Sequence, residues 1–293
     1  MPRTVILIRC VEFDQRVSEM VDSFKVYLPG WTVIAVPDML GKSDGGVKSA
    51  LGDYPIITLP ITDEFVRSNG LHYAPNVNKT GWLCGDYVLY RALEKEWDYA
   101  WVVEPDVFFL NGAEKYLKRL QLLEHDLLAT QVWPTGRNWM WGKALDDVIP
   151  GLTLGAMSFP LLRCSRELAL EALELRRRVA ENSMDAALLP NDEVIVATAA
   201  RNSGKSSLNI MTLYEEEFQH FGTEVKRNVD DLQRSYSEPL IVHSGRGKDE
   251  FMEFLSFYWH GTLDGNKARK RQFLSALATC NIETVVEFLE DNV

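Results

Sequence analysis

Residues 99–109 read YAWVVEPDVFF, an apolar run interrupted by two carboxylates that are separated by one residue. The aromatic and β-branched residues before Glu104 are typical of a buried strand. In an extended chain, residues i and i+2 point to the same side, so Glu104 and Asp106 converge where this strand ends. Open α/β sheets bind their ligands at the carboxyl ends of their strands. The stretch therefore predicts an α/β fold with an acidic site at one edge of the sheet.

Strand-like and helix-like segments alternate on both sides of this stretch. Strands separated by helices predict a central, mostly parallel sheet that is flanked by helices. The pattern is looser after residue 150, where residues 152–159 indicate a strand or a hairpin, and helical spacing returns after residue 250. We expect one α/β domain over residues 1–250 and a helical C-terminal extension over residues 251–293, packed on that domain.

The composition describes an ordinary globular protein. Hydrophobic residues make up 46% of the 293 residues and charged residues 25%. The four cysteines form no CxxC pair, which disfavours a zinc ribbon or a disulfide framework. No apolar run approaches the length of a membrane-spanning helix, and the run at residues 5–8 is too short for a signal peptide. We therefore expect a cytoplasmic protein.

The charge balance limits the partners that the chain can bind. A net charge of −11 makes nucleic acid an unfavourable partner, because long-range repulsion opposes encounter. Two basic clusters, Arg176–Arg178 and Lys267–Arg271, are expected on solvated helix faces. They leave peripheral contact with phosphate groups or a membrane surface open. Nothing in the sequence indicates an oligomeric state.

The acid pair and a distant histidine form a candidate metal site. Glu104 and Asp106 suit a hard divalent cation, Mg²⁺ or Mn²⁺, although an isolated pair of this kind is more often a turn with two solvated acids. His243 ends an apolar strand at residues 240–242, and Mn²⁺ accepts its nitrogen more readily than Mg²⁺ does. Ser244, Arg246 and Lys248 follow it, interspersed with glycine, as candidate anion-binding groups. A structural histidine beside surface charges is the alternative.

Two further segments carry candidate ligand-binding or catalytic groups. Asp192 and Glu193 begin a predicted helix behind Asn191, so one of them can act as a general base, while helix capping alone also explains the composition. Gly81 allows a close approach of the backbone to a ligand, and Asp86 can bond a ribose or a base. A plain helix start is equally compatible with that second segment.

The order of these elements resembles that of the GT-A fold nucleotide-sugar glycosyltransferases over roughly residues 4–248. Glu104-Pro105-Asp106 resembles their DxD-type motif, residues 191–193 resemble the acidic helix start that supplies the base in inverting members, and His243 resembles their late metal ligand. The motif departs from the family pattern, since its first acid is Glu and a proline follows. In the family the last acid usually binds the metal directly, which favours Asp106 over Glu104.

The resemblance implies a Rossmann-like GT-A fold with a nucleotide-sugar half over about 1–110 and an acceptor half over about 111–250. It implies metal-dependent transfer of a sugar from a UDP- or GDP-sugar to a hydroxyl of a glycan, a lipid-linked sugar, a protein or a small molecule. In this reading Gly81, Asp86 and the Ser244–Lys248 loop bind the donor. Acceptor binding is predicted for three tryptophans in an expected loop, Trp133, Trp139 and Trp141, because aromatic faces stack on sugar rings. The alternative is that these tryptophans only cover the core.

Three other functions compete with this one. A sugar-phosphate nucleotidyltransferase normally carries a glycine-rich basic loop after the first strand, whereas residues 9–16 contain no glycine. A non-catalytic carbohydrate- or nucleotide-binding protein on the same fold would lose its metal ligands, yet both acids and His243 are present. A phage-type DNA glucosyltransferase is disfavoured by the negative net charge.

Overall fold

The computed structural model describes residues 2–42, 56–73, 83–183, 189–222, 225–263 and 265–292. Contacts within the chain divide it into two units. The first comprises Met1–Pro105 and Tyr116–Leu213, and the second comprises Asp106–Lys115 and Tyr214–Val293. The boundary expected at residue 250 and the two substrate-binding halves remain predictions.

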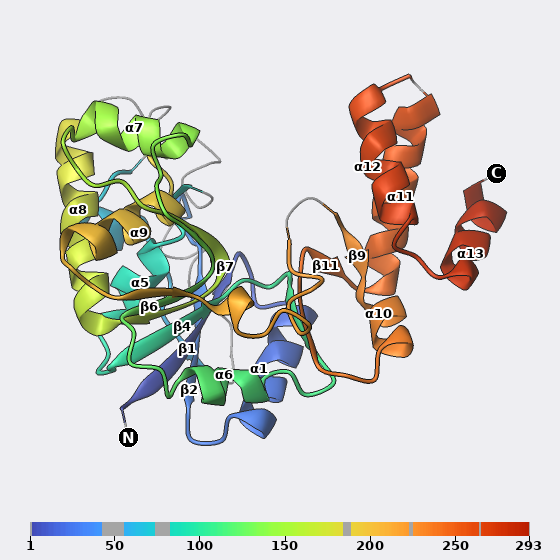
Figure 1. Cartoon of the computed structure of the whole chain (residues 1–293), viewed down its shortest axis with the longest axis horizontal. Helices are drawn as coiled ribbons and strands as arrows, with labels where there is room; N and C mark the ends of the chain where they lie inside the picture. The colour runs from blue at the N-terminus through green and yellow to red at the C-terminus, as the bar shows by residue number, and fades with distance from the viewer. Residues whose placement is uncertain are drawn as a thin grey trace. The chain divides into compact units, whose positions relative to one another are not determined.

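A seven-stranded sheet forms the centre of the first unit, in the order β3-β2-β1-β4-β7-β6-β8 (Figure 1). β7 runs antiparallel to its neighbours, while the other strands run in one direction. The predicted α/β class with a mostly parallel sheet is therefore confirmed. The strands are β1 (Thr4–Cys10), β2 (Thr32–Pro37), β3 (Ile57–Thr58), β4 (Tyr99–Val103), β6 (Leu127–Trp133), β7 (Ala156–Ser165) and β8 (Ser207–Asn209).

Helices cover both faces of this sheet (Figure 1). Alternate residues of β1 point to opposite faces of the sheet, and both sets are buried. Val5 and Leu7 belong to the main core cluster, which includes residues of α5, α8 and α9. Ile6 and Ile8, on the other face, are also fully buried. The helices are α1 (Gln15–Tyr27), α3 (Asp63–Ser68), α5 (Tyr87–Ala92), α6 (Lys115–Leu120), α7 (Met140–Val148), α8 (Arg166–Asn182) and α9 (Asp192–Asn202), with a 3-10 turn, η2 (Ile210–Thr212).

Of the strand or hairpin expected at residues 152–159, the structure has the strand, β7, which begins at Ala156, lies between β4 and β6 and is buried throughout. One segment differs from the sequence-based expectation. The loop expected around Trp139 and Trp141 contains helix α7, whose Trp139 is the N-cap residue. Short amphipathic helices such as α7 lack the length over which a period becomes visible.

The second unit contains two small strand pairs and three C-terminal helices. β5 (Val107–Leu110) pairs antiparallel with β10 (Leu240–His243), and β9 (Arg227–Asn228) pairs with β11 (Gly245–Arg246), beside α10 (Val229–Ser235). The helices α11 (Lys248–Leu263), α12 (Lys267–Leu277) and α13 (Ile282–Asn292) share an aromatic core around Phe251, Phe273 and Phe288. The predicted helical C-terminal region is thus confirmed. Within the described ranges, every helix is too short or too polar to cross a lipid bilayer.

Candidate active site

The acidic motif Glu104-Pro105-Asp106 links β4 to β5. β4 lies beside β1 in the sheet, with Val103 opposite Ile8, so Glu104 leaves the sheet at the carboxyl ends of two parallel strands. The Glu104 N–H donates a hydrogen bond to the Pro160 carbonyl at 3.0 Å. The Asp106 carbonyl accepts one from the Gly245 N–H at 3.2 Å. Backbone contacts thus fix the chain on both sides of the motif.

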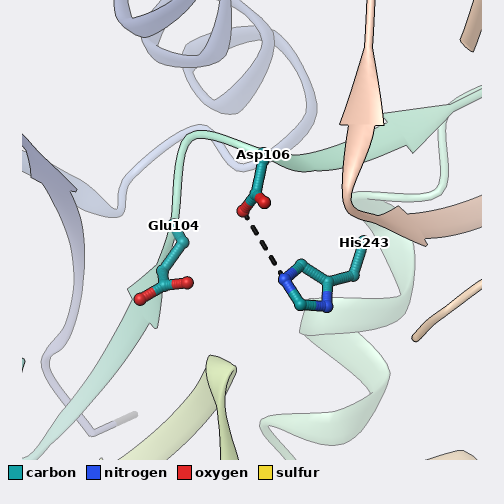
Figure 2. A group of neighbouring side chains, drawn as sticks. All are labelled: Glu104, Asp106 and His243. Carbon is teal, nitrogen blue, oxygen red and sulfur yellow. Dashed lines mark ion pairs between the residues drawn. The ribbon is translucent and has the colours of Figure 1, made fainter. Parts of the chain in front are cut away.

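Asp106 and His243 lie side by side within the second unit. The β5–β10 register places His243 opposite Val107, and His243 Nε2 lies 3.6 Å from Asp106 Oδ1 (Figure 2). The imidazole is buried, with 5% of its side chain exposed. Burial lowers the pKa of His243, assisted by the charge of Lys226 and opposed by that of Asp106. The ring is therefore held in its neutral form, which is the form that binds a metal.

Glu104 stands two residues before Asp106, at the end of β4 (Figure 2). One ligand atom from each of Glu104, Asp106 and His243 lies within 4.8 Å of the others. The proximity of Glu104 to Asp106 is a property of the local chain, since only Pro105 separates them. Two carboxylates and one neutral imidazole are a donor set for Mn²⁺ or Mg²⁺. His243 Nδ1, moreover, is buried without a hydrogen-bond partner among the described residues. These residues fit a divalent cation.

Arg9 is a site residue that the sequence did not reveal. It lies near the carboxyl end of β1, with its Nη1 2.6 Å from Glu104 Oε1 and 3.9 Å from Asp192 Oδ2. Burial alone would lower the pKa of Arg9, but the charges of Glu104, Asp192 and Asp38 outweigh it and raise that pKa. The guanidinium therefore stays charged and links the acidic motif to the start of α9. Only the strand order, which places β1 beside β4, could have indicated this contact.

Asp192 and Glu193 form the first turn of α9, and Asn191 caps the helix through a hydrogen bond from the Val194 N–H. Burial raises the pKa of Asp192 well above its usual value, with a further rise from the charge of Glu193, and Arg9 opposes both. Burial also raises the pKa of Glu193 to about 7, against the hydrogen bonds from Asn191 and Phe159 that favour its charged form. Capping and a titrating acid pair thus coexist at one helix start.

The Glu193 carboxylate is held by two donors. Its Oε1 accepts from the Phe159 N–H at 3.1 Å, and its Oε2 accepts from the Asn191 amide at 2.8 Å. Asp192 is only 4% exposed, whereas Glu193 retains more accessible surface. Glu193 is therefore the better oriented and more accessible of the two acids.

The donor-binding role predicted for Asp86 does not agree with its surroundings, and Gly81 lies outside the described residues. Asp86 is fully buried, and its oxygens accept from Arg176 Nε and Nη2, both at 2.8 Å, and from the Tyr90 hydroxyl at 2.7 Å. Arg176, expected on a solvated face, is fully buried too. The expectation of a solvated face was wrong because Arg176 lies on the inward face of α8. Its partner there, Asp86, is supplied by tertiary packing, which the sequence does not show.

The loop after His243 is more constrained than the sequence indicated. Ser244 is buried, has a φ of 61°, and its hydroxyl accepts from Lys226 Nζ at 3.1 Å. Lys248 begins α11 and pairs with Glu287 at 2.7 Å. Arg246 Nε is buried without a hydrogen-bond partner in the described part of the chain. Arg246 is thus the predicted anion-binding residue with unused donor capacity, and Lys226 is a nearby cation that the sequence analysis missed.

The three tryptophans do not share a loop. Trp133 ends β6 and is 41% exposed, with its ring centroid 5.7 Å from that of Trp139. Trp139 and Trp141 are partly buried and pack against the main core. Among the three, Trp133 has the exposed aromatic surface that a sugar ring needs.

No protein-family model matches the chain, and no curated protein matches it either. Among solved structures, the galactosyltransferase LgtC with donor and acceptor sugar analogues is similar at a TM-score of 0.41 and 9% identity, over 80% of this chain and 79% of its own. Glucosyl-3-phosphoglycerate synthase from Mycobacterium tuberculosis, solved with Mn²⁺, UDP and phosphoglyceric acid, gives a TM-score of 0.34 and 15% identity, over 64% of this chain and 66% of its own.

HddC from Yersinia pseudotuberculosis is similar at a TM-score of 0.31 and 12% identity, over 58% of this chain and 79% of its own. At identities and TM-scores this low, the fold assignment depends on the chain itself. Its strand order and the helices on both faces of the sheet show an α/β fold with a mostly parallel sheet (Figure 1).

Proposed function

We propose that this chain is a metal-dependent glycosyltransferase, which transfers a sugar from a nucleotide-diphosphate sugar to an acceptor hydroxyl. The observation that supports the proposal best is the pairing of Asp106 with His243 at 3.6 Å, with Glu104 two residues earlier. Ligand atoms on one octahedral cation with bonds of about 2.1 Å lie roughly 3 Å apart when they are neighbours. The observed spacing needs only a small contraction to meet that value.

Asp106, His243 and Glu104 would hold Mn²⁺ or Mg²⁺ in this enzyme. The bound cation supplies positive charge that stabilises a leaving nucleoside diphosphate. Arg246 and Lys226 are the cations of the second unit best suited to assist. Arg246 has a buried Nε without a partner in the described residues, and Lys226 Nζ already orients the Ser244 hydroxyl. Lys248 contributes less, because Glu287 compensates its charge.

Glu193 is the base that we assign for an inverting reaction. Its carboxylate is oriented by Phe159 and Asn191, and its pKa of about 7 is matched to proton transfer near neutral pH. In this role it removes the proton from the attacking acceptor hydroxyl. Asp192, more buried and close to Arg9, acts as a neighbour that tunes the charge of the site.

A thermal-shift screen of UDP- and GDP-sugars, with and without Mn²⁺, tests the proposal. Ligands that bind the folded state raise its apparent stability. We expect one donor to raise the melting temperature only when Mn²⁺ is present. Asp106→Ala and His243→Ala should abolish that shift, whereas Asp147→Ala, which removes an exposed acid of α7, should keep it. A donor shift that needs no metal, or one that survives Asp106→Ala, would overturn the proposed site.

Transfer kinetics with the donor so identified test the base. Glu193→Gln should lower kcat by about 10²–10⁴-fold, the usual contribution of general base catalysis, while the Mn²⁺-dependent donor shift remains. Asp192→Asn should slow transfer less. If Asp192→Asn has the larger effect on kcat, the assignment of the base moves to Asp192.

A further inference from the structure

The first unit contains a pocket of about 340 Å³ to which no residue of the proposed metal site and neither acid at the start of α9 contributes. Its walls come from the end of β6, the start of β7, the last turns of α9 and the segment that enters β8. Its lining includes Trp133, Ala156, Ala197, Arg201, Lys205 and Ser207.

The pocket is separate from the acid cluster at the start of α9. Asp192 is the first residue of that helix, and Arg201 lies nine residues later. With a rise of about 1.5 Å per residue, the two ends are about 13 Å apart along the helix axis. Arg201 is therefore out of hydrogen-bond reach of the acids at the start of α9, and none of those acids lines the pocket.

Arg201 gives the pocket a positive charge that no acid of the described ranges compensates. Its side chain is exposed, and no ion pair joins it to an acid among the described residues. Lys205, by contrast, lies 3.4 Å from Asp126 and 3.9 Å from Glu167. Arg201 also complements the dipole of α9, but that role needs no cavity beside it. A guanidinium at the rim of a cavity suits a carboxylate or a phosphate, which it binds with two parallel hydrogen bonds.

The remaining walls suit a sugar ring. Trp133 is 41% exposed, and its contact with Trp139 fixes the ring in place. Ala156 and Ala197 supply small apolar surfaces, and Ser207 supplies a hydroxyl. An aromatic face with a few polar groups is the usual surface for a saccharide. We propose that this pocket binds a saccharide that carries a carboxylate or a phosphate, with the ring on Trp133 and the anionic group on Arg201.

Calorimetric titration with glucose 6-phosphate, glucuronate, glucose and inorganic phosphate tests this inference. The titrations contain EDTA, so that a metal-dependent donor site does not contribute and the outcome is independent of the transfer reaction. We expect glucose 6-phosphate and glucuronate to bind, and glucose or phosphate alone to bind at least about tenfold more weakly, because each lacks one of the two contacts.

Variants of exposed residues locate the binding. Arg201→Gln should weaken binding of glucose 6-phosphate about tenfold, while Arg178→Gln, which removes an exposed arginine of α8 and gives the same net charge, should leave it unchanged. Trp133→Ala should weaken both charged sugars severalfold, and Trp133→Phe should restore part of the loss. The inference fails if neither charged sugar binds, if Arg201→Gln or Trp133→Ala binds like the wild type, or if phosphate alone binds as well as glucose 6-phosphate.

Discussion

Two arginine–carboxylate clusters in the first unit differ in how completely their charges are compensated. Asp86 and Arg176 form a bidentate pair with two contacts of 2.8 Å, and both side chains are fully buried. Arg9 is shared between Glu104 at 2.6 Å and Asp192 at 3.9 Å, and 20% of its side chain is exposed. The first cluster is balanced, with one acid for one cation, whereas in the second Arg9 is shared by two acids at the edge of the sheet.

The difference separates a saturated ion pair from a cluster whose acids can still titrate. Arg176 also donates to the Pro190 carbonyl at 2.7 Å, so the first cluster has no capacity left for a ligand. In the second cluster the acids outnumber the cation, and the pKa values of Asp192 and Glu193 are raised, chiefly by burial. Buried acids whose pKa values are raised in this way allow proton transfer near neutral pH.

The largest expected effect on stability comes from breaking the balanced cluster of Asp86 and Arg176. Arg176→Met leaves Asp86 as an uncompensated buried charge and should lower the free energy of unfolding by about 3–5 kcal/mol. Urea denaturation followed by circular dichroism measures the change. Arg178→Met, two residues along the same helix but exposed, is the control and should change stability by less than about 0.5 kcal/mol. Equal stability of the two variants would mean that the Asp86–Arg176 pair does not hold the fold.

The acid-rich cluster should make stability depend on pH. The pKa of Glu193 in the folded chain, about 7, exceeds its usual value of 4.5, so protonation favours the fold. The contribution is complete below the unfolded pKa and is lost as pH rises through about 7. We expect the free energy of unfolding to fall by about 1–3 kcal/mol between about pH 5 and pH 9. Glu193→Gln removes the titrating group, and a curve of unchanged slope in this variant would assign the effect to other groups.

Gly85 and Asp86 are neighbours in the sequence, yet each belongs to a different cluster. A Cβ on Gly85 would overlap with Asp192 Oδ2 and lie 2.7 Å from Arg9 Nη1. Gly85→Ala should therefore displace both side chains, at a cost of about 1–3 kcal/mol in stability, and should slow transfer. Gly222→Ala is the matched control, because a Cβ there meets nothing within 4 Å. A Gly85→Ala variant with wild-type stability and kcat would show that the acids tolerate displacement.

The sequence predicted the strands and helices better than it predicted the two arginine–carboxylate clusters. Alternating apolar runs and helical spacing identified β1, β4 and α9 because each has a regular pattern over its own length. The acids Glu104, Asp106 and Asp192 were also recognisable, since they stand where strands or helices begin or end. Arg9 and Arg176 were not, because an arginine is assigned to a cluster only by its neighbours in space. Strand order and the inward face of α8 supply those neighbours.

The smallest expected effect comes from removing the cation of the acid-rich cluster. Arg9→Met takes a positive charge away from Glu104 and removes the contact at 2.6 Å with its Oε1. Mn²⁺ should then bind about three- to tenfold more tightly, since a charge repulsion is removed at a partly solvated site. Free Mn²⁺ measured by electron paramagnetic resonance gives the affinity directly. Arg3→Met, which removes an exposed arginine next to the opposite end of β1, should leave it unchanged. An Arg9→Met variant with weaker Mn²⁺ binding would show that Arg9 positions Glu104 for the metal rather than competing for it.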